Sequence, residues 1–162
     1  MILIGLGANL SSEAGPPEAT LKAALNALDR RLIRPGPVSG LYKTLAWPNE
    51  SDPAFVNQVA RLNTQLNPAE LMAALHEVEM SFGRKRSVKN APRTLDLDLL
   101  DYDDRIEPGP PELPHPRMQE RSFVLIPLRD VAPLWRHPVS HRSIDELIAA
   151  LGPAAGSPQR ID

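Results

Sequence analysis

The order in which apolar periodicity changes along the chain most limits the fold it can adopt. Four segments have continuous or alternating apolar residues, which is typical of strands, and two repeat them every three or four residues, which is typical of amphipathic helices. The expected strands are residues 1–7, 38–46, 55–66 and 94–102, and the expected long helices begin at Pro16-Pro17 and at Asn67. This βαββαβ order predicts a ferredoxin-like α+β sandwich with a mainly antiparallel sheet and both long helices against one face.

Local signals place the helix ends. The first helix keeps its apolar stripe through Leu32, and the second has an Asn67 cap followed by proline and ends at Gly83. Residues 123–131 can form a short helix, and a capping box at Ser143 opens a last one. We therefore expect extra short helices on the C-terminal side of the sandwich.

Composition excludes several kinds of site. The 162 residues include no cysteine, which rules out zinc–thiolate sites, iron–sulfur clusters and a cysteine nucleophile. The 18 Lys+Arg and 20 Asp+Glu give a net charge of −2, which argues against a DNA-coating surface, and the 18 prolines predict stiffened loops. No apolar run reaches the roughly 18 residues of a membrane span, and no basic leader opens the chain. We expect a single cytoplasmic domain over residues 1–162, monomeric and binding neither nucleic acid nor membrane.

The charge changes sign abruptly within residues 84–107. Five basic residues and no acid occupy 84–93, and six acids with one arginine follow. Side chains alternate on a strand, so Asp96 and Asp98 share one face and the leucines between and beside them share the other. Two neighbouring carboxylates repel each other and favour a bound cation, and hard oxygen ligands favour Mg²⁺ with substrate phosphates. A basic segment beside this pair predicts polyphosphate chemistry.

The same residues also have plainer interpretations. An Asp-x-Asp pair is often only a solvated strand face, and the basic run 84–89 is often a solvated loop or a weak nucleic-acid patch. Gly5-Leu-Gly7 is not followed by glycine at position 10, so it is interpreted as a tight turn rather than a dinucleotide fingerprint. His115, between two prolines, is a candidate ligand contact. Phe55 near Asn57 suits a heteroaromatic ring, or alternatively a core position.

The segment Lys89-Asn-Ala-Pro-Arg-Thr-Leu-Asp-Leu-Asp-Leu-Leu100 fits the signature of the 6-hydroxymethyl-7,8-dihydropterin pyrophosphokinase family at every defined position. Further matches occur in the family's order: Gly7-Ala-Asn9, Tyr42-Lys-Thr44, Phe55-Val-Asn57, Glu79, Gly83-Arg84, Pro114-His-Pro116, Arg121, Phe123 and Pro127-Leu128. Over roughly residues 1–150 the chain thus resembles this folate-pathway family. The resemblance implies transfer of the pyrophosphoryl group of ATP to the hydroxymethyl oxygen of 6-hydroxymethyl-7,8-dihydropterin, giving AMP and the pterin diphosphate.

The resemblance also implies roles for single residues. Asp96 and Asp98 would hold two Mg²⁺ ions, and Arg84 and Arg93 match the family's catalytic arginines. The implied ATP contacts are Glu79, Arg84, Arg86, Arg93, Leu99, His115 and Arg121. The implied pterin contacts are Thr44, Leu45, Ala46, Phe55, Asn57, Asp96 and Phe123.

Two other functions fit part of the pattern. A Mg²⁺-dependent nucleotidyl- or glycosyl-transferase would use the same Asp-x-Asp pair, but it would leave Phe55, Asn57 and Phe123 without a ring to bind. A small RNA-binding module can share the βαββαβ sheet, but it needs aromatic and basic side chains on the sheet face where this chain has carboxylates.

Overall fold

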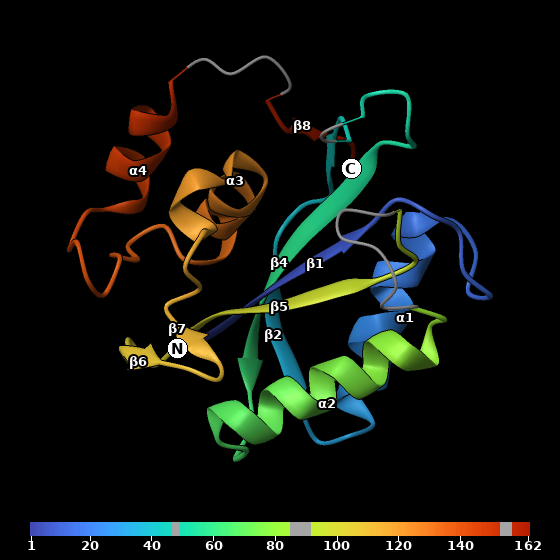
Figure 1. Ribbon diagram of the computed structural model, residues 1–162, viewed down its shortest axis with the longest axis horizontal. Helices are drawn as coiled ribbons and strands as arrows, with labels where there is room; N and C mark the ends of the chain where they lie inside the picture. The colour runs from blue at the N-terminus through green and yellow to red at the C-terminus, as the bar shows by residue number, and fades with distance from the viewer. Residues whose placement is uncertain (47–48, 85–91, 153–156) are drawn as a thin grey trace.

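The structure, a computed structural model, describes residues 1–46, 49–84, 92–152 and 157–162, which form a central sheet with helices on both faces (Figure 1). The strands of this sheet are β1 (Ile2–Ala8), β2 (Arg34–Val38), β3 (Tyr42–Thr44), β4 (Phe55–Asn63), β5 (Asp96–Tyr102) and β8 (Gln159–Arg160). A separate hairpin pairs β6 (Glu107–Pro108) with β7 (Glu112–Leu113). The helices are α1 (Pro17–Asp29), α2 (Pro68–Ser81), α3 (Ser122–Val131), α4 (Ile144–Leu151) and a 3-10 turn, η1 (Met118–Glu120).

The sheet is antiparallel and runs in the order β5-β1-β4-β3-β8, with β2 also paired to β4. β1 is therefore a central strand between β4 and β5. Its register sets Gly5 opposite Asp98 and Gly7 opposite Asp96. The α+β class and the mainly antiparallel sheet predicted from the sequence are confirmed.

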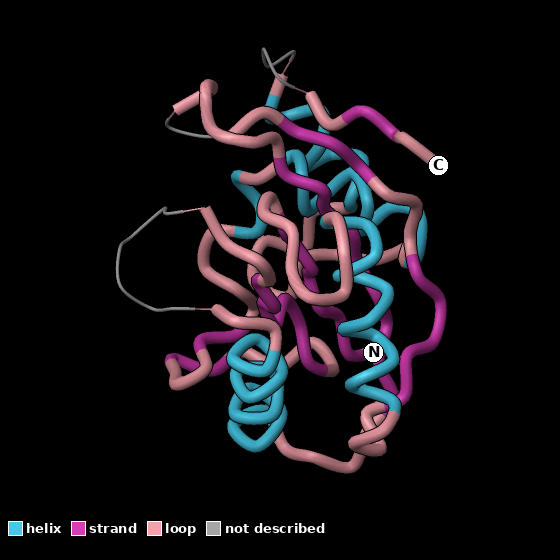
Figure 2. The backbone as a smooth tube through the Cα atoms, turned by 90° about the vertical axis from the view of Figure 1, so that its right-hand side faces the viewer, coloured by secondary structure: helices cyan, strands magenta, loops and turns pink. Residues whose placement is uncertain are grey.

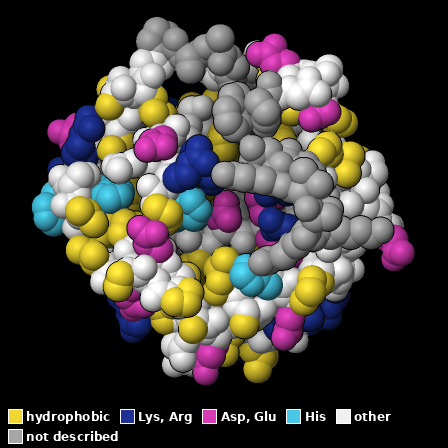
Figure 3. Space-filling model, viewed as in Figure 1, with side chains coloured by type: hydrophobic (Ala, Val, Ile, Leu, Met, Phe, Trp, Pro, Cys, Tyr) yellow, Lys and Arg dark blue, Asp and Glu magenta, His cyan; other side chains and the backbone are white. Residues whose placement is uncertain are grey.

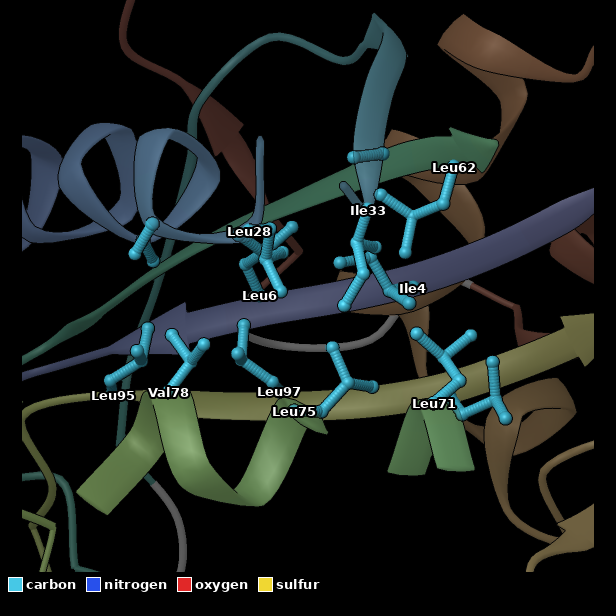
Figure 4. Close-up of a cluster of buried hydrophobic side chains, with 14 of the residues drawn as sticks. Ile4, Leu6, Leu28, Ile33, Leu62, Leu71, Leu75, Val78, Leu95 and Leu97 are labelled. Atoms are coloured by element: carbon cyan, nitrogen blue, oxygen red, sulfur yellow. The ribbon is translucent and has the colours of Figure 1, made fainter. Parts of the chain in front are cut away.

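α1 and α2 cover one face of the sheet, as the apolar periodicity predicted (Figure 1). Figure 4 shows leucine, isoleucine and valine side chains from the strands and from both helices meeting in this layer. Leu95, Leu97 and Leu99 belong to it, so the alternation in β5 directs these leucines toward α1 and α2. At α2 the predicted Asn67 cap is present: the Asn67 side chain accepts from the Glu70 N–H, and the Glu70 side chain accepts the Asn67 N–H in return, which completes a capping box.

α3 covers the opposite face, and α4 packs against α3 (Figure 1). Leu3, Val59 and Leu100 project from the sheet toward them and pack with Trp135 and other buried residues of the C-terminal part. This second layer consists of the short C-terminal helices expected from the sequence, and it forms one wall of the site described below. Among the described residues, no helix is long and apolar enough to cross a membrane.

Two sequence expectations about local structure are wrong. α1 ends at Asp29 rather than continuing through Leu32, whose side chain is 73% exposed and whose φ is +62°. That left-handed residue turns the chain so that Ile33 enters the core instead. The expected strand 38–46 is also interrupted, and β2 contains Pro35 and Pro37, which have no N–H to donate to a ladder.

Candidate active site

Asp96 and Asp98 project from β5 on the face opposite Leu97 and Leu99, toward α3, and both line a cavity of about 320 Å³. The shared face predicted for the two carboxylates is therefore confirmed. Figure 3 shows acidic and basic side chains close together in a recess near the middle of the molecule's face. The other lining residues are Gly5, Leu6, Gly7, Thr44, Leu45, Phe55, Asn57, Gln58, Val59, Arg93, Arg117, Glu120, Arg121, Phe123 and Val124.

Gly5 and Gly7 form the floor of this cavity, a role that the sequence interpretation missed. They lie inside β1, so the tight turn expected there is wrong. A Cβ on Gly7 would come within 3.3 Å of Asn57 Oδ1, so a side chain here would crowd the cavity. Glycine inside an apolar strand is a signal for close approach by a ligand, and that signal was available in the sequence.

Asp96 is held by two arginines. Arg84 donates to one of its carboxylate oxygens, and Arg93 Nη1 lies 2.8 Å from the other. Arg84 also donates to Glu79, whose side chain is 1% exposed and also accepts the Leu97 N–H at 2.7 Å. Buried Glu79 of α2 thus connects the Arg84 side chain to the start of β5.

Asn9 positions Arg93. Its Oδ1 accepts the Arg93 N–H at 2.8 Å, and its own N–H donates to the Arg93 carbonyl at 3.1 Å. Its Nδ2 donates to the Pro53 carbonyl at 3.0 Å. Buried Asn9 therefore connects the end of β1 to Pro53, in the segment before β4, and to Arg93, in the signature segment 89–100.

Asp98 lies 3.5 Å from Arg121, yet its charge is poorly compensated. Burial, and then repulsion from Asp96, raise the pKa of Asp98 from 3.8 to about 6, and the nearby arginines offset only part of this. No group of three metal-ligating side chains occurs among the described residues. A buried carboxylate with a raised pKa beside a second carboxylate fits a Mg²⁺ site whose remaining ligands are phosphate oxygens and water.

The raised pKa of Asp98 predicts a change in stability with pH. Between about pH 4 and pH 6 the folded state binds more protons at Asp98 than the unfolded state does. The contribution of Asp98 to the free energy of unfolding therefore falls as the pH rises from about 4 to about 6. Above pH 6 the folded protein retains an unfavourable buried charge. Asp98→Asn should therefore raise Tm at pH 8 in EDTA and change it little at pH 5, where Asp98 is mostly protonated.

Thermal unfolding of wild type and variant at the two pH values checks this. Asp104→Asn is the matched control, since Asp104 is exposed and asparagine tolerates its positive φ of 55°. A lower Tm for Asp98→Asn at pH 8 would contradict the assignment.

The opposite end of the cavity is apolar and suited to a flat ring. Phe55 projects from β4 and Phe123 from α3, where 36% of the Phe123 side chain is exposed. The Arg121 guanidinium lies 5.7 Å from the centre of the Phe123 ring. Buried Asn57 donates through Nδ2 to Thr44 Oγ1 at 2.9 Å, which leaves its carbonyl oxygen as an acceptor.

Other residues implied by the resemblance lie around the cavity or beneath it. Leu45 lines it, whereas Ala46 is buried and Leu99 is 3% exposed within the core under β5. His115 is outside the lining set; burial, and then Arg121, lower its pKa, so neutral imidazole is favoured. Its Nδ1 accepts from the Arg117 N–H at 3.1 Å, which assigns the proton to Nε2. Arg86 lies outside the described residues.

Arg117 and Glu120 line the cavity and had no signal in the sequence analysis. Both follow the turn at His115 and reach the site through the 3-10 turn.

A larger, more open depression of about 610 Å³ surrounds Trp135 and His137, but its described lining includes one carboxylate, Asp104. The smaller cavity is therefore the better candidate, because it combines paired carboxylates, arginines and aromatic rings.

Comparison with known proteins agrees with this arrangement. Residues 3–133 match the sequence model of the family described as 7,8-dihydro-6-hydroxymethylpterin-pyrophosphokinase (HPPK). A 2-amino-4-hydroxy-6-hydroxymethyldihydropteridine pyrophosphokinase of Pseudomonas aeruginosa is 40% identical over 154 residues, covering 92% of this chain and 90% of the relative. One from Synechocystis is 39% identical over 148 residues, covering 90% and 73%.

Solved structures show the same fold. Wild-type HPPK-DHPS of Plasmodium falciparum superposes with a TM-score of 0.69 at 14% identity over 92% of this chain. The match spans 44% of that longer chain, and at this identity it establishes the fold alone.

Proposed function

Because the chain belongs to the 7,8-dihydro-6-hydroxymethylpterin-pyrophosphokinase family, it transfers the pyrophosphoryl group of ATP to hydroxymethyldihydropterin in folate biosynthesis, and we propose that the cavity between β5 and α3 is its active site. The observation that carries this proposal is the position of Asp96 and Asp98. They line one cavity together with Arg93, Arg121 and the Phe55–Phe123 pair, and Asp96 also contacts Arg84.

Arg84, Arg93 and Arg121 bind the triphosphate in this proposal. All three already contact a carboxylate of the site, so their guanidinium groups face the space where phosphates would lie. A triphosphate carries more negative charge than one carboxylate and would draw the arginines away from Asp96 and Asp98. Glu79 then acts indirectly, because it holds Arg84, and Leu99 supports β5 from the core.

Asp96 and Asp98 become available for Mg²⁺ as the arginines turn to the phosphates. Two carboxylates with phosphate oxygens suit one or two Mg²⁺ ions, and we assign two. When bound, Mg²⁺ would neutralise phosphate charge and lower the pKa of the pterin hydroxyl. The raised pKa of Asp98 supports this assignment, since a bound cation would offset both of its causes, burial first and then repulsion from Asp96.

The pterin ring would lie between Phe55 and Phe123, with its polar edge toward Asn57 and Thr44. Aromatic faces favour a flat heterocycle, and the free carbonyl of Asn57 can accept from its N–H groups. Leu45, in the segment after β3, lines the same cavity, and we assign buried Ala46, the next residue, to the pterin site with it. This position aims the hydroxymethyl group at Asp96 and Asp98.

The reaction joins the hydroxymethyl oxygen to the β-phosphorus and breaks the bond from that phosphorus to the oxygen bridging it to the α-phosphate. AMP leaves with that oxygen, and the hydroxyl proton is released. Arg84 and Arg93 neutralise the negative charge that grows on the departing oxygen. Asn9 keeps Arg93 in place for this step.

Direct assay of the products tests the proposal. The protein mixed with ATP, Mg²⁺ and the hydroxymethylpterin should form AMP and pterin diphosphate in equal amounts, and no AMP should form without the pterin. Release of free pyrophosphate from ATP, with the AMP unit transferred to an acceptor, would favour a nucleotidyltransferase instead. Tight RNA binding in EDTA, with no AMP formed, would favour the RNA-binding module.

A further inference from the structure

One side chain at the C-terminal end of α3 connects this helix to strand β3. Asp130 accepts hydrogen bonds from the Tyr42 hydroxyl at 3.0 and 3.2 Å and from the Gly40 N–H at 3.1 Å. None of these residues lines the cavity around Asp96 and Asp98. The function proposed above therefore leaves this contact unexplained.

The contact between Tyr42 and Asp130 connects α3 and β3, the two walls of the proposed pterin pocket. Phe123 and Asp130 are seven residues apart on α3, so two helical turns place them on the same side of the helix. Tyr42 and Thr44 are two residues apart on β3, so they share one face of the strand. One pair, Tyr42 with Asp130, is in contact, while the other, Thr44 with Phe123, faces the cavity. The contact thus sets how far apart the cavity walls stand.

The contact is well protected. Tyr42 is 7% exposed, and burial, followed by the hydrogen bond to Asp130, raises the pKa of its hydroxyl above the ordinary value. The phenol therefore stays protonated and donates throughout the physiological pH range. Tyr42 also pairs with Asn57 across the β3–β4 ladder, so a shift of β3 would reach the amide at the pocket's edge.

The C-terminal strand completes the same cluster. β8 pairs with the outer edge of β3, as Figure 2 shows near the marked C-terminus, and Arg160 lies 3.8 Å from Asp130. Asp162 accepts the Leu41 N–H at 3.0 Å. A Cβ on Gly40 would come within 2.7 Å of Arg160 Nε and 2.9 Å of Asp162 Oδ1, so a side chain at this position would displace the ends of these two side chains.

We propose that Asp130 is a positioning residue for the pterin pocket, and that residues 159–162 act with it by holding β3 against α3. The inference rests on the proposed pterin site between Phe123 and Thr44. It predicts that weakening the contact reduces pterin affinity while the arginines and carboxylates around ATP continue to work.

Tyr42→Phe and Asp130→Asn test the contact between Tyr42 and Asp130 directly. Each should raise KM for the pterin by about fivefold or more, with kcat and the Kd for ATP changed less than about twofold. Pterin Kd, measured by fluorescence with α,β-methylene ATP present, should rise in parallel. Tyr102→Phe is the matched control: Tyr102 also donates a hydrogen bond, at 2.6 Å to the Leu66 carbonyl, but far from the pocket.

Truncation after Pro158 and Gly40→Ala test the C-terminal strand. Both should raise KM for the pterin, whereas Arg129→Ala should not. That control removes an exposed ion pair between Arg129, which is on α3 like Asp130, and Asp145 of α4. The truncation needs no new side chain in the fold, so it remains informative if Gly40→Ala fails to fold.

Phe123→Ala distinguishes failure of the proposed pterin site from failure of the positioning role of Asp130. If Phe123→Ala leaves pterin affinity unchanged, the pterin site itself is misplaced. If Phe123→Ala weakens pterin binding while Tyr42→Phe, Asp130→Asn and the truncation bind it as wild type does, the positioning role is wrong. A loss in Tyr102→Phe as large as in Tyr42→Phe would also overturn it, because general destabilisation would then explain both.

Discussion

Asp96→Ala should lower the turnover number by about three orders of magnitude or more while leaving the fold intact. The side chain is partly exposed at the cavity and belongs to neither core cluster, so its removal creates no void in the packing. It contacts both proposed catalytic arginines and is a proposed Mg²⁺ ligand. Its loss removes a proposed ligand of the cation that would neutralise phosphate charge, and a loss of this kind acts on the transition state.

Initial rates of AMP formation at saturating ATP and pterin measure the effect, and circular dichroism shows whether the fold persists. Asp104→Asn removes an exposed carboxylate from the same segment and should retain wild-type turnover. A folded Asp96→Ala variant with near-normal turnover would exclude the carboxylate pair from catalysis.

Arg93→Ala should reduce kcat far more than it weakens ATP binding, by about 100-fold or more against a few-fold change in Kd. Charge on the departing α-phosphate oxygen exists only as the bond breaks, so a guanidinium directed at it contributes more to the transition state than to the bound substrate. The side chain is already held near the reacting position, with Nη1 2.8 Å from Asp96. Arg93→Lys should recover only part of the rate, because lysine cannot present two donors in a plane.

Single-turnover rates and nucleotide titrations separate the two effects. Arg105→Ala is the control for charge, since Arg105 lies on the surface and pairs with Glu107 at 3.5 Å. A variant with normal kcat and only a higher KM for ATP would make Arg93 a binding residue alone.

Much of the site could be predicted from short stretches of sequence. In residues 95–99 the alternation of leucine and aspartate placed the leucines in the core and both carboxylates in the cavity. Such alternation follows from the geometry of an extended backbone, whatever the rest of the chain does. The capping boxes at Asn67 and Ser143 were predictable for the same reason, because each involves residues three apart.

Other features were not accessible in this way. Leu32 continues the apolar stripe of α1 by its spacing, yet the helix ends before it and Ile33 occupies the core. Glu79 was implied as an ATP contact by resemblance, but its carboxylate lies buried under Arg84 and the start of β5. Burial of a side chain depends on which elements pack over it, and periodicity does not state this.

By itself, the amino-acid sequence determined the order of strands and helices, the face of β5 that carries the carboxylates and the family to which the chain belongs. Only the tertiary structure decided that α3 closes the cavity, that Gly5 and Gly7 form its floor, and that Asp130 meets Tyr42 across 88 positions of sequence. The physical reason is the separation in sequence over which each kind of interaction acts. Alternation, helical spacing and capping act within a few covalent bonds, whereas contacts between distant segments exist only once the sheet and both helical layers have packed together.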